Sequence, residues 1–219
     1  MKHCDNGSDR LSFLFLEPFY GGSHRDFLLG LTGGLLALGA GVAGEQATEA
    51  ATLLGACVTL FDLDSDRVQR IASRYERCTG VVSSPEAVAE ALVDADLVVS
   101  AVMVAGRRAT VVIRESMIDA MPEGSVIVDI AIDQGGSVEN IHMTSYEQPV
   151  YRDRGVLFQA VPNMPGAVPR TASQALSFAV LPYVTELLEK GIDESRLSAA
   201  VSVKDGKVVD PVLREELGL

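Results

Sequence analysis

Residues 39–44 read Gly-Ala-Gly-Val-Ala-Gly, and this glycine turn decides the fold. An apolar run at residues 35–38 precedes it, and residues 43–54 follow with apolar side chains at helical spacings of three and four. A second apolar run, residues 57–62, ends at Asp62. A strand, a G-x-G-x-x-G turn, a helix and an acidic residue at the end of the next strand form the context in which this pattern indicates a dinucleotide-binding site.

Each position of the turn has a physical reason. Gly39 permits the tight turn, Gly41 lets the backbone approach a pyrophosphate, and Gly44 allows the helix to pack closely on the strand. A helix that begins near Val42 directs its unpaired N–H groups and the positive end of its dipole at the pyrophosphate. Val42 and Ala43 therefore join the three glycines as predicted cofactor-binding residues.

Asp62 is placed to accept hydrogen bonds from a ribose diol. A carboxylate at this place repels a 2′-phosphate, so the sequence favours NAD over NADP. Glu45, in the first turn of the expected helix, adds negative charge beside the phosphate site, and we expect its side chain to point to solvent. A glycine turn without a ligand is the alternative interpretation.

Strands and helices alternate through the rest of the chain. We expect further strands at residues 81–82, 97–102, 125–132 and 157–161, and helices at residues 65–74, 85–93, 113–121 and 171–190. Asp64 or Ser65 is expected to cap the first of these helices and Ser84 the second. Asp205-Gly206 indicates a hairpin within residues 201–209.

This order predicts an α/β fold: a Rossmann-type, doubly wound parallel sheet with a short C-terminal helix and hairpin appendage. We divide the chain into an N-terminal segment (residues 1–33), a dinucleotide-binding domain with its exit helix (residues 34–190) and the appendage (residues 191–219).

Composition excludes several classes of function. The formal net charge of −12 argues against nucleic acid or an anionic membrane as a partner. Cys4, Cys57 and Cys78 are too few and too scattered for a zinc site or a disulfide framework, so we expect no metal and a reducing, cytoplasmic location. The apolar run at 11–16 is too short for a signal peptide, and the run at 27–44 is interrupted by glycines, so we expect no membrane span.

From about residue 34 onward the chain resembles the C-terminal, NAD-binding part of alanine dehydrogenase. The resemblance rests on the glycine turn and on residues 95–102 (ADLVVSAV), 124–136 (GSVIVDIAIDQGG), 161–171 (VPNMPGAVPRT) and 211–219 (PVLREELGL). The wider family includes the NAD-binding subunit of proton-translocating transhydrogenase. The sequence Asp-Gln-Gly-Gly at 133–136 favours the alanine dehydrogenase side of that family.

The resemblance implies site residues beyond the glycine turn. Ala101 and Val102 would line the ribose on the nicotinamide side, and Asn163 and Met164 would contact the nicotinamide end. Asp133 would be the catalytic acidic residue that faces the reacting centre. From the residues alone, Asp133 could instead be a carboxylate that caps its loop, and Asn163 could satisfy the backbone of a turn.

The implied reaction is reversible NAD-dependent oxidative deamination of L-alanine to pyruvate and ammonia, carried out by a homo-oligomer. That chemistry needs a cation for the substrate carboxylate and a group that handles the proton of the attacking water. The family takes these from an N-terminal substrate domain, which we expect to be missing here. His142 is expected to be a surface residue rather than a substitute catalyst.

Residues 11–31 resemble the start of glycosyltransferases similar to tRNA-queuosine mannosyltransferase, through EPFYGGSH at 17–24. In such enzymes this segment is the first strand and the loop beyond it, so His24 and Arg25 are possible substitute ligands. Three classes of function follow: an alanine dehydrogenase, a non-catalytic NAD-binding or oligomerisation module, and a glycosyltransferase. NADH binding with and without alanine-dependent turnover separates the first two.

Overall fold

The computed structural model describes residues 34–104 and 106–219. The expected strand at 11–16 and the loop that carries His24 and Arg25 lie outside the described residues. The described chain divides into two compact units. The first comprises the described residues up to 103 together with residues 108–162, and the second comprises residues 104–107 and 163–219.

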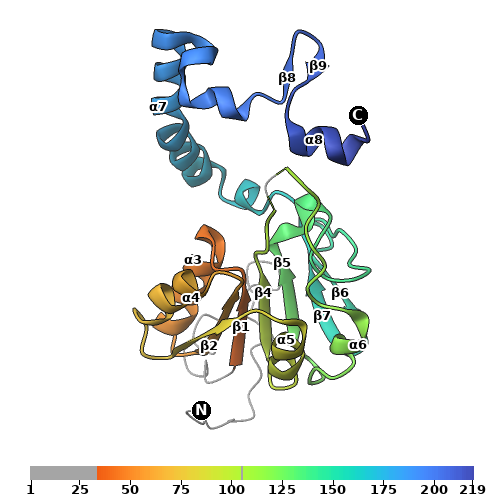
Figure 1. Ribbon diagram of the computed structural model, residues 1–219. Coiled ribbons are helices and arrows are strands. Elements are labelled where there is room, and N and C mark those ends of the chain that lie inside the picture. Colours follow the sequence, from red (N-terminus) through yellow and green to blue (C-terminus); the bar gives the residue numbers. More distant parts are fainter. Residues whose placement is uncertain (1–33, 105) are drawn as a thin grey trace. The chain divides into compact units, whose positions relative to one another are not determined.

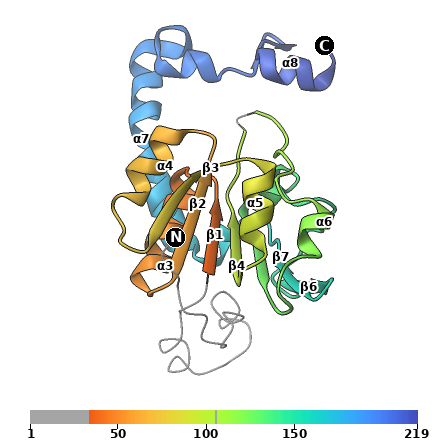
Figure 2. The same ribbon diagram turned by 60° about the horizontal axis from the view of Figure 1, so that its bottom comes forward.

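A seven-stranded sheet forms the first unit, in the order β3-β2-β1-β4-β5-β7-β6. Figure 1 labels β2, β1, β4, β5, β7 and β6, and Figure 2 labels β3. All neighbours pair in parallel except β6 and β7, which pair antiparallel. The strands are β1 (Gly34–Leu38), β2 (Cys57–Asp62), β3 (Cys78–Val82), β4 (Leu97–Ser100), β5 (Val126–Asp129), β6 (Val150–Asp153) and β7 (Val156–Gln159). The predicted Rossmann-type α/β fold is confirmed.

Among the described residues, the helices that flank this sheet are α3 (Val42–Leu53), α4 (Ser65–Ala72), α5 (Pro85–Leu92) and α6 (Glu115–Ile118). Figure 2 shows α3 and α4 beside the β1–β3 half and α5 and α6 beside the other half. Alternate residues of a strand point to the same face of the sheet. Leu36 and Leu38 of β1 accordingly pack in one cluster with Val88 and Leu92 of α5. The chain runs outward from β1 through β2 to β3 and then crosses back to β4 beside β1, which is the connectivity of a doubly wound sheet.

The capping residues define where two of the helices begin. Asp64, not Ser65, caps α4 by accepting a hydrogen bond from the Arg67 amide, and Ser84 caps α5 through the Ala87 amide. Pro85 occupies the first position of α5, where its missing N–H costs nothing. The predicted cap at Ser84 is thus confirmed, and of the two residues considered for α4, Asp64 is the cap.

Several element boundaries differ from the expectation. The helix expected at 113–121 is only Glu115–Ile118, and the strand expected at 125–132 ends at Asp129, where a 3-10 helix, η1 (Ile130–Gln134), begins. The strand β6 was not expected. The strand expected at 157–161 is Val156–Gln159.

The second unit contains the predicted hairpin and terminal helix. Its elements are the 3-10 helices η2 (Met164–Ala167) and η3 (Arg196–Ala200), the helices α7 (Pro169–Glu194) and α8 (Pro211–Leu217), and the strands β8 (Val203–Lys204) and β9 (Lys207–Val208). Asp205 and Gly206 make the hairpin turn with φ values of 51° and 74°. Gly191 interrupts α7 with a non-helical φ of 73°. Within this unit Arg107 forms an ion pair of 2.5 Å with Glu215 of α8.

Candidate functional site

The carboxyl ends of β1, β2, β4 and β5 meet at one edge of the sheet. The order of the strands reverses between β1 and β4, since β1 leads on to β2 whereas β4 leads on to β5. In open α/β sheets, ligands bind outside the carboxyl ends of the strands at such a switch point. The segments that follow these four strands therefore constitute the candidate site.

Gly39 and Gly44 are held where only glycine fits. Gly39 has a φ of 94°, and a Cβ there would lie 2.8 Å from the Ala101 carbonyl oxygen. A Cβ on Gly44 would lie 1.7 Å from the Gly39 carbonyl oxygen. These contacts agree with the roles predicted from sequence, a tight turn at Gly39 and a close approach of helix to strand at Gly44.

Gly41 differs from both, because a Cβ there would meet no atom of residues 34–104 or 106–219 within 4 Å. Gly41 is the N-cap of α3, with an extended backbone and no side chain capping the first turn. Val42, the first residue of α3, is 85% exposed, and Ala43 is exposed beside it. The first N–H groups of the helix thus lie at an open surface, which is the usual arrangement for binding an anionic group.

Asp62, the last residue of β2, connects β2 to the glycine turn. Its Oδ2 accepts a hydrogen bond of 2.7 Å from the Ala40 amide, and its Oδ1 accepts one of 3.0 Å from the Asp64 amide. The Arg67 guanidinium lies 3.7 Å from Oδ2, and the Asp62 side chain is 16% exposed. Sequence reasoning placed Asp62 at the cofactor but missed that it also fixes the turn.

Ala101 and Val102 follow β4 directly and lie against the same turn. The Ala101 amide donates to the Leu38 carbonyl at 2.8 Å, and the Ala101 Cβ lies 3.9 Å from the ideal Cβ position of Gly44. Both residues are partly exposed. The structure therefore brings together, at one edge of the sheet, the predicted residues of the glycine turn and of the strand ends beside it: Gly39, Gly41, Val42, Ala43, Gly44, Asp62, Ala101 and Val102.

Glu45 does not point freely to solvent as expected. Its carboxylate pairs with the Arg74 guanidinium, and its side chain is 24% exposed. The expectation failed because Arg74 lies 29 residues further along the chain, beyond the end of α4, so only the fold brings the two side chains together. The pairing offsets the negative charge that Glu45 adds near the start of α3.

Asp133 lies exposed in η1, in the loop that follows β5. A residue that sequence reasoning passed over, Asp129, lies at the start of this loop and is completely buried. Burial raises the pKa of the Asp129 carboxyl, although hydrogen bonds from Ser137, Ala131 and Val138 oppose the increase. The one sequence signal was a carboxylate inside the apolar run VIVDIAI.

Asn163 and Met164 belong to the second unit. Asn163 adopts a left-handed conformation (φ 52°, ψ 49°) before η2, and its carbonyl accepts a 2.8 Å hydrogen bond from the Gly166 amide. Its side chain is exposed, and that of Met164 is partly exposed. Their contacts with a cofactor stay a prediction.

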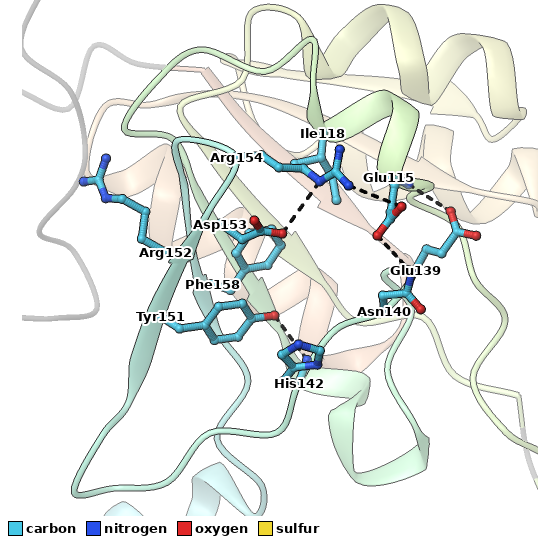
Figure 3. Close-up of a pocket in the computed structure, with 10 residues that line it drawn as sticks. All are labelled: Glu115, Ile118, Glu139, Asn140, His142, Tyr151, Arg152, Asp153, Arg154 and Phe158. Carbon is cyan, nitrogen blue, oxygen red and sulfur yellow. Dashed lines mark hydrogen bonds and ion pairs between the residues drawn. The ribbon is translucent and has the colours of Figure 1, made fainter.

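A surface pocket of about 250 Å³ lies elsewhere, beside β6 and β7 (Figure 3). The Tyr151 ring stacks between His142 and Phe158, and the Tyr151 hydroxyl accepts a hydrogen bond from the His142 amide. Arg154 forms ion pairs with Glu115 at 3.3 Å and Asp153 at 3.7 Å. His142 is an exposed residue of this pocket, remote in the sheet order from the β1–β4 switch point.

Across residues 34–104 and 106–219, the structure contains no helix that is long and apolar enough to cross a membrane. Within the same ranges, no group of three or more His, Cys, Asp or Glu side chains is arranged to hold a metal ion.

Comparison with known proteins identifies relatives of this chain. Residues 31–211 match the family described as "Alanine dehydrogenase/PNT, C-terminal domain". The chain is 39% identical over 188 residues to alanine dehydrogenase of Bacillus subtilis, and 41% identical over 188 residues to that of Halomonas elongata. These alignments cover 83% of the chain but 50% and 51% of the two relatives, so the chain spans about half their length.

Solved structures give the same result. An L-alanine dehydrogenase superimposes with a TM-score of 0.74 at 39% identity, covering 85% of this chain and 53% of that one. A transhydrogenase from Sinorhizobium meliloti superimposes with a TM-score of 0.66 at 27% identity, covering 82% and 50%.

Proposed function

Because the chain belongs to the family of alanine dehydrogenase/PNT C-terminal domains, whose cofactor is NAD, we propose that it binds NAD at the β1–β4 switch point as the nucleotide-binding part of an alanine dehydrogenase. The observation that carries the proposal is the geometry of the glycine turn. A Cβ at Gly39 or Gly44 would collide with backbone, whereas a Cβ at Gly41 would contact no atom of the described residues. In the proposed complex, the pyrophosphate approaches the backbone at Gly41.

The residues present fit the cofactor. Gly41, Val42 and Ala43 would hold the pyrophosphate at the start of α3, where N–H groups and the helix dipole favour negative charge. The partly exposed Asp62 carboxylate would accept hydrogen bonds from the adenosine ribose. Ala101 and Val102 would line the ribose on the nicotinamide side, and Asn163 and Met164 would contact the nicotinamide end.

Asp62 also supports selection of NAD over NADP. Its two oxygens already accept hydrogen bonds from the Ala40 and Asp64 amides, so its position is fixed before a ligand arrives. A 2′-phosphate near this carboxylate would meet electrostatic repulsion. Arg67, 3.7 Å from Asp62, reduces that repulsion in part.

For the chemistry, we propose reversible oxidative deamination of L-alanine to pyruvate and ammonia. NAD, when bound, accepts the hydride that leaves the Cα of the amino acid, and water then replaces the nitrogen. Asp133 is the proposed catalytic residue, because an exposed carboxylate at the carboxyl edge can hold a proton of the attacking water. A cation that binds the substrate carboxylate would come from residues equivalent to the part of the related alanine dehydrogenases that this chain does not match.

The second candidate function is a non-catalytic NAD-binding or oligomerisation module. The observation that supports it is that the glycine turn and Asp62, which would bind NAD, are arranged in the same way whether or not the protein turns over a substrate. A cytoplasmic location and a homo-oligomeric state also belong to the proposal. Light scattering on a size-exclusion column tests the oligomeric state.

Fluorescence titration with NADH tests the proposed cofactor site. We expect saturable binding by the wild type and binding at least about tenfold weaker in Asp62→Ala, since hydrogen bonds to a charged group contribute about 1.5–3 kcal/mol. Asp66→Ala removes an equal charge from the exposed first turn of α4 and should bind NADH like the wild type. Circular dichroism and the unfolding midpoint verify that each variant is folded.

Alanine-dependent reduction of NAD, measured on the same wild-type sample, separates the two candidate functions. Binding with turnover supports the dehydrogenase, and binding without turnover supports the module. No NADH binding by folded wild type would overturn both.

A further inference from the structure

The carboxylate of Asp129 accepts hydrogen bonds from both ends of the loop that carries Asp133. Asp129 ends β5 and is completely buried. Its Oδ1 accepts a 2.8 Å hydrogen bond from the Ala131 amide, at the beginning of the loop. Its Oδ2 accepts a 2.7 Å hydrogen bond from the Ser137 amide, at the end of the loop. One side chain thereby closes residues 130–136 into a fixed loop.

Two buried serines, Ser137 and Ser100, continue these hydrogen bonds to the neighbouring strand β4. The Ser137 hydroxyl donates to Asp129 Oδ2 at 3.1 Å, which leaves its oxygen able to accept from the Ser100 hydroxyl, 2.5 Å away. Ser100 is the last residue of β4 and directly precedes Ala101. The protons are therefore ordered from Ser100 through Ser137 to Asp129, and the chain of hydrogen bonds links the ends of β4 and β5.

The closed loop has little room to rearrange. Gly135 and Gly136 have φ values of 98° and 79°, and a Cβ on Gly136 would lie 2.4 Å from Ile141 Cγ2 and 3.3 Å from Asp129 Oδ2. The Ser137 carbonyl also accepts from the Val112 amide at 2.7 Å. Against this packed base, Asp133 is exposed in the middle of the loop.

An apolar side chain at position 129 would avoid the cost of burying a carboxylate. A carboxylate there instead satisfies loop amides that an apolar residue would leave without acceptors. The geometry thus points to control of loop shape as the task of Asp129.

We propose that Asp129 is a positioning residue, which with Ser137 and Ser100 holds the loop 130–136, and through it Asp133, against the nicotinamide half of the cofactor. In doubly wound folds the two halves of a dinucleotide lie on opposite sides of the switch point, so the nicotinamide half lies over β4 and β5. The inference rests on the proposed function for the cofactor and on the hydrogen bonds above for the loop.

Two ligands that share the ADP-ribose portion and differ only in the nicotinamide ring test the positioning role. NADH reaches both halves of the site, whereas ADP-ribose lacks the nicotinamide. We expect Asp129→Asn and Ser137→Ala to weaken NADH binding by about fivefold or more, with ADP-ribose affinity within about twofold of the wild type. Ser125→Ala is the matched control, because Ser125 is a buried hydroxyl beside the amino end of β5 that donates to Ala95 and Pro122 carbonyls.

Amide hydrogen exchange of the ligand-free chain supplies a second readout. We expect faster exchange confined to residues 130–137 in Asp129→Asn and Ser137→Ala, and wild-type exchange there in Ser125→Ala. If Asp129→Asn does not fold, Ser137→Ala, which keeps the backbone hydrogen bond, decides the question.

Equal losses of NADH and ADP-ribose affinity would overturn the positioning role, as would unchanged exchange at residues 130–137. If the wild type binds neither ligand, the proposed function fails, and with it the claim about the nicotinamide. Exchange that is faster only at residues 130–137 would still support the hold of Asp129 on the loop.

Discussion

At the residue scale, three glycines of one turn occupy three different environments. Gly39 is required by its positive φ and Gly44 by backbone that would lie 1.7 Å from an added Cβ. At Gly41, an added Cβ would contact no atom of the residues that the structure describes. We attribute the glycine at position 41, where the described structure leaves room for a side chain, to the close backbone approach of the proposed cofactor. The difference between Gly41 and Gly44 therefore separates cofactor binding from folding.

Alanine substitutions exploit this difference. We expect Gly44→Ala to lower the free energy of unfolding by about 1–3 kcal/mol or more, because helix and strand must move apart. Gly41→Ala should change it by less than about 1 kcal/mol, since Gly41 is an N-cap with open space around it. NADH binding should nevertheless weaken at least about tenfold in Gly41→Ala.

Urea denaturation and NADH titration measure the two effects separately. Wild-type NADH affinity in Gly41→Ala would contradict the placement of the pyrophosphate. A wild-type unfolding midpoint in Gly44→Ala would contradict the close packing of α3 on β1.

Asp129 gives a residue-scale prediction about pH. Because its pKa is raised in the folded state, its contribution to stability is present below its ordinary pKa of about 3.9 and is lost as the pH rises through the folded value. The stability of the wild type relative to Asp129→Asn should therefore be greatest at acidic pH and decrease as the pH rises. Urea denaturation over a series of pH values, with Asp66→Asn as charge-matched control, measures this difference; a constant difference would contradict the raised pKa.

At the element scale, α4 packs on the edge strand β3 through Gly80. A Cβ there would lie 2.4 Å from Val68 Cγ1 and 3.1 Å from the Ala72 Cβ, both on α4. Gly80→Ala should lower the free energy of unfolding by about 1–3 kcal/mol through overpacking. Thr79→Ala, at an exposed neighbouring position, should change it by only a few tenths of a kcal/mol.

Chemical denaturation of both variants tests this contact. Equal unfolding midpoints for Gly80→Ala and Thr79→Ala would show that α4 does not pack on β3 as described. NADH affinity should stay at the wild-type value in both, because neither residue lies at the carboxyl edge.

Elements with strong local signals were predicted from the sequence. The Ser84-Pro85 start of α5 and the apolar runs of the central parallel strands depend on residues close together in the chain. Boundaries fixed by distant residues were not predicted. Ile113 forms a β-bridge with Val138, which keeps it out of the helix expected at 113–121. The Asp129 carboxylate binds the Ala131 amide and ends the strand expected at 125–132.

The same distinction applies to the site. The glycine turn and Asp62 form a pattern with known spacing and were found in the sequence, whereas Asp129 was read as part of an apolar strand. Its partners Ser100 and Ser137 come from other segments, so only the fold reveals the cluster. The strand β6 was missed for a related reason, since its short, half-exposed run becomes a strand by pairing with β7.

At the scale of the whole molecule, the predicted site residues fall into two groups. The glycine turn, Asp62, Ala101, Val102 and Asp133 belong to the first unit, and Asn163 and Met164 belong to the second. The first group contains all the residues that we propose to bind the adenosine and pyrophosphate parts of NAD. The central claim is thus that the carboxyl edge of the first unit is a cofactor site.

Hydrogen exchange of the full chain with and without NADH tests that claim most directly. Saturating NADH should protect amides in residues 39–46, 62–64, 100–102 and 130–137, which form the carboxyl edge, and leave the pocket beside β6 unchanged. Protection centred on His142 and Tyr151 instead, or no protection anywhere in the folded chain, would contradict the account.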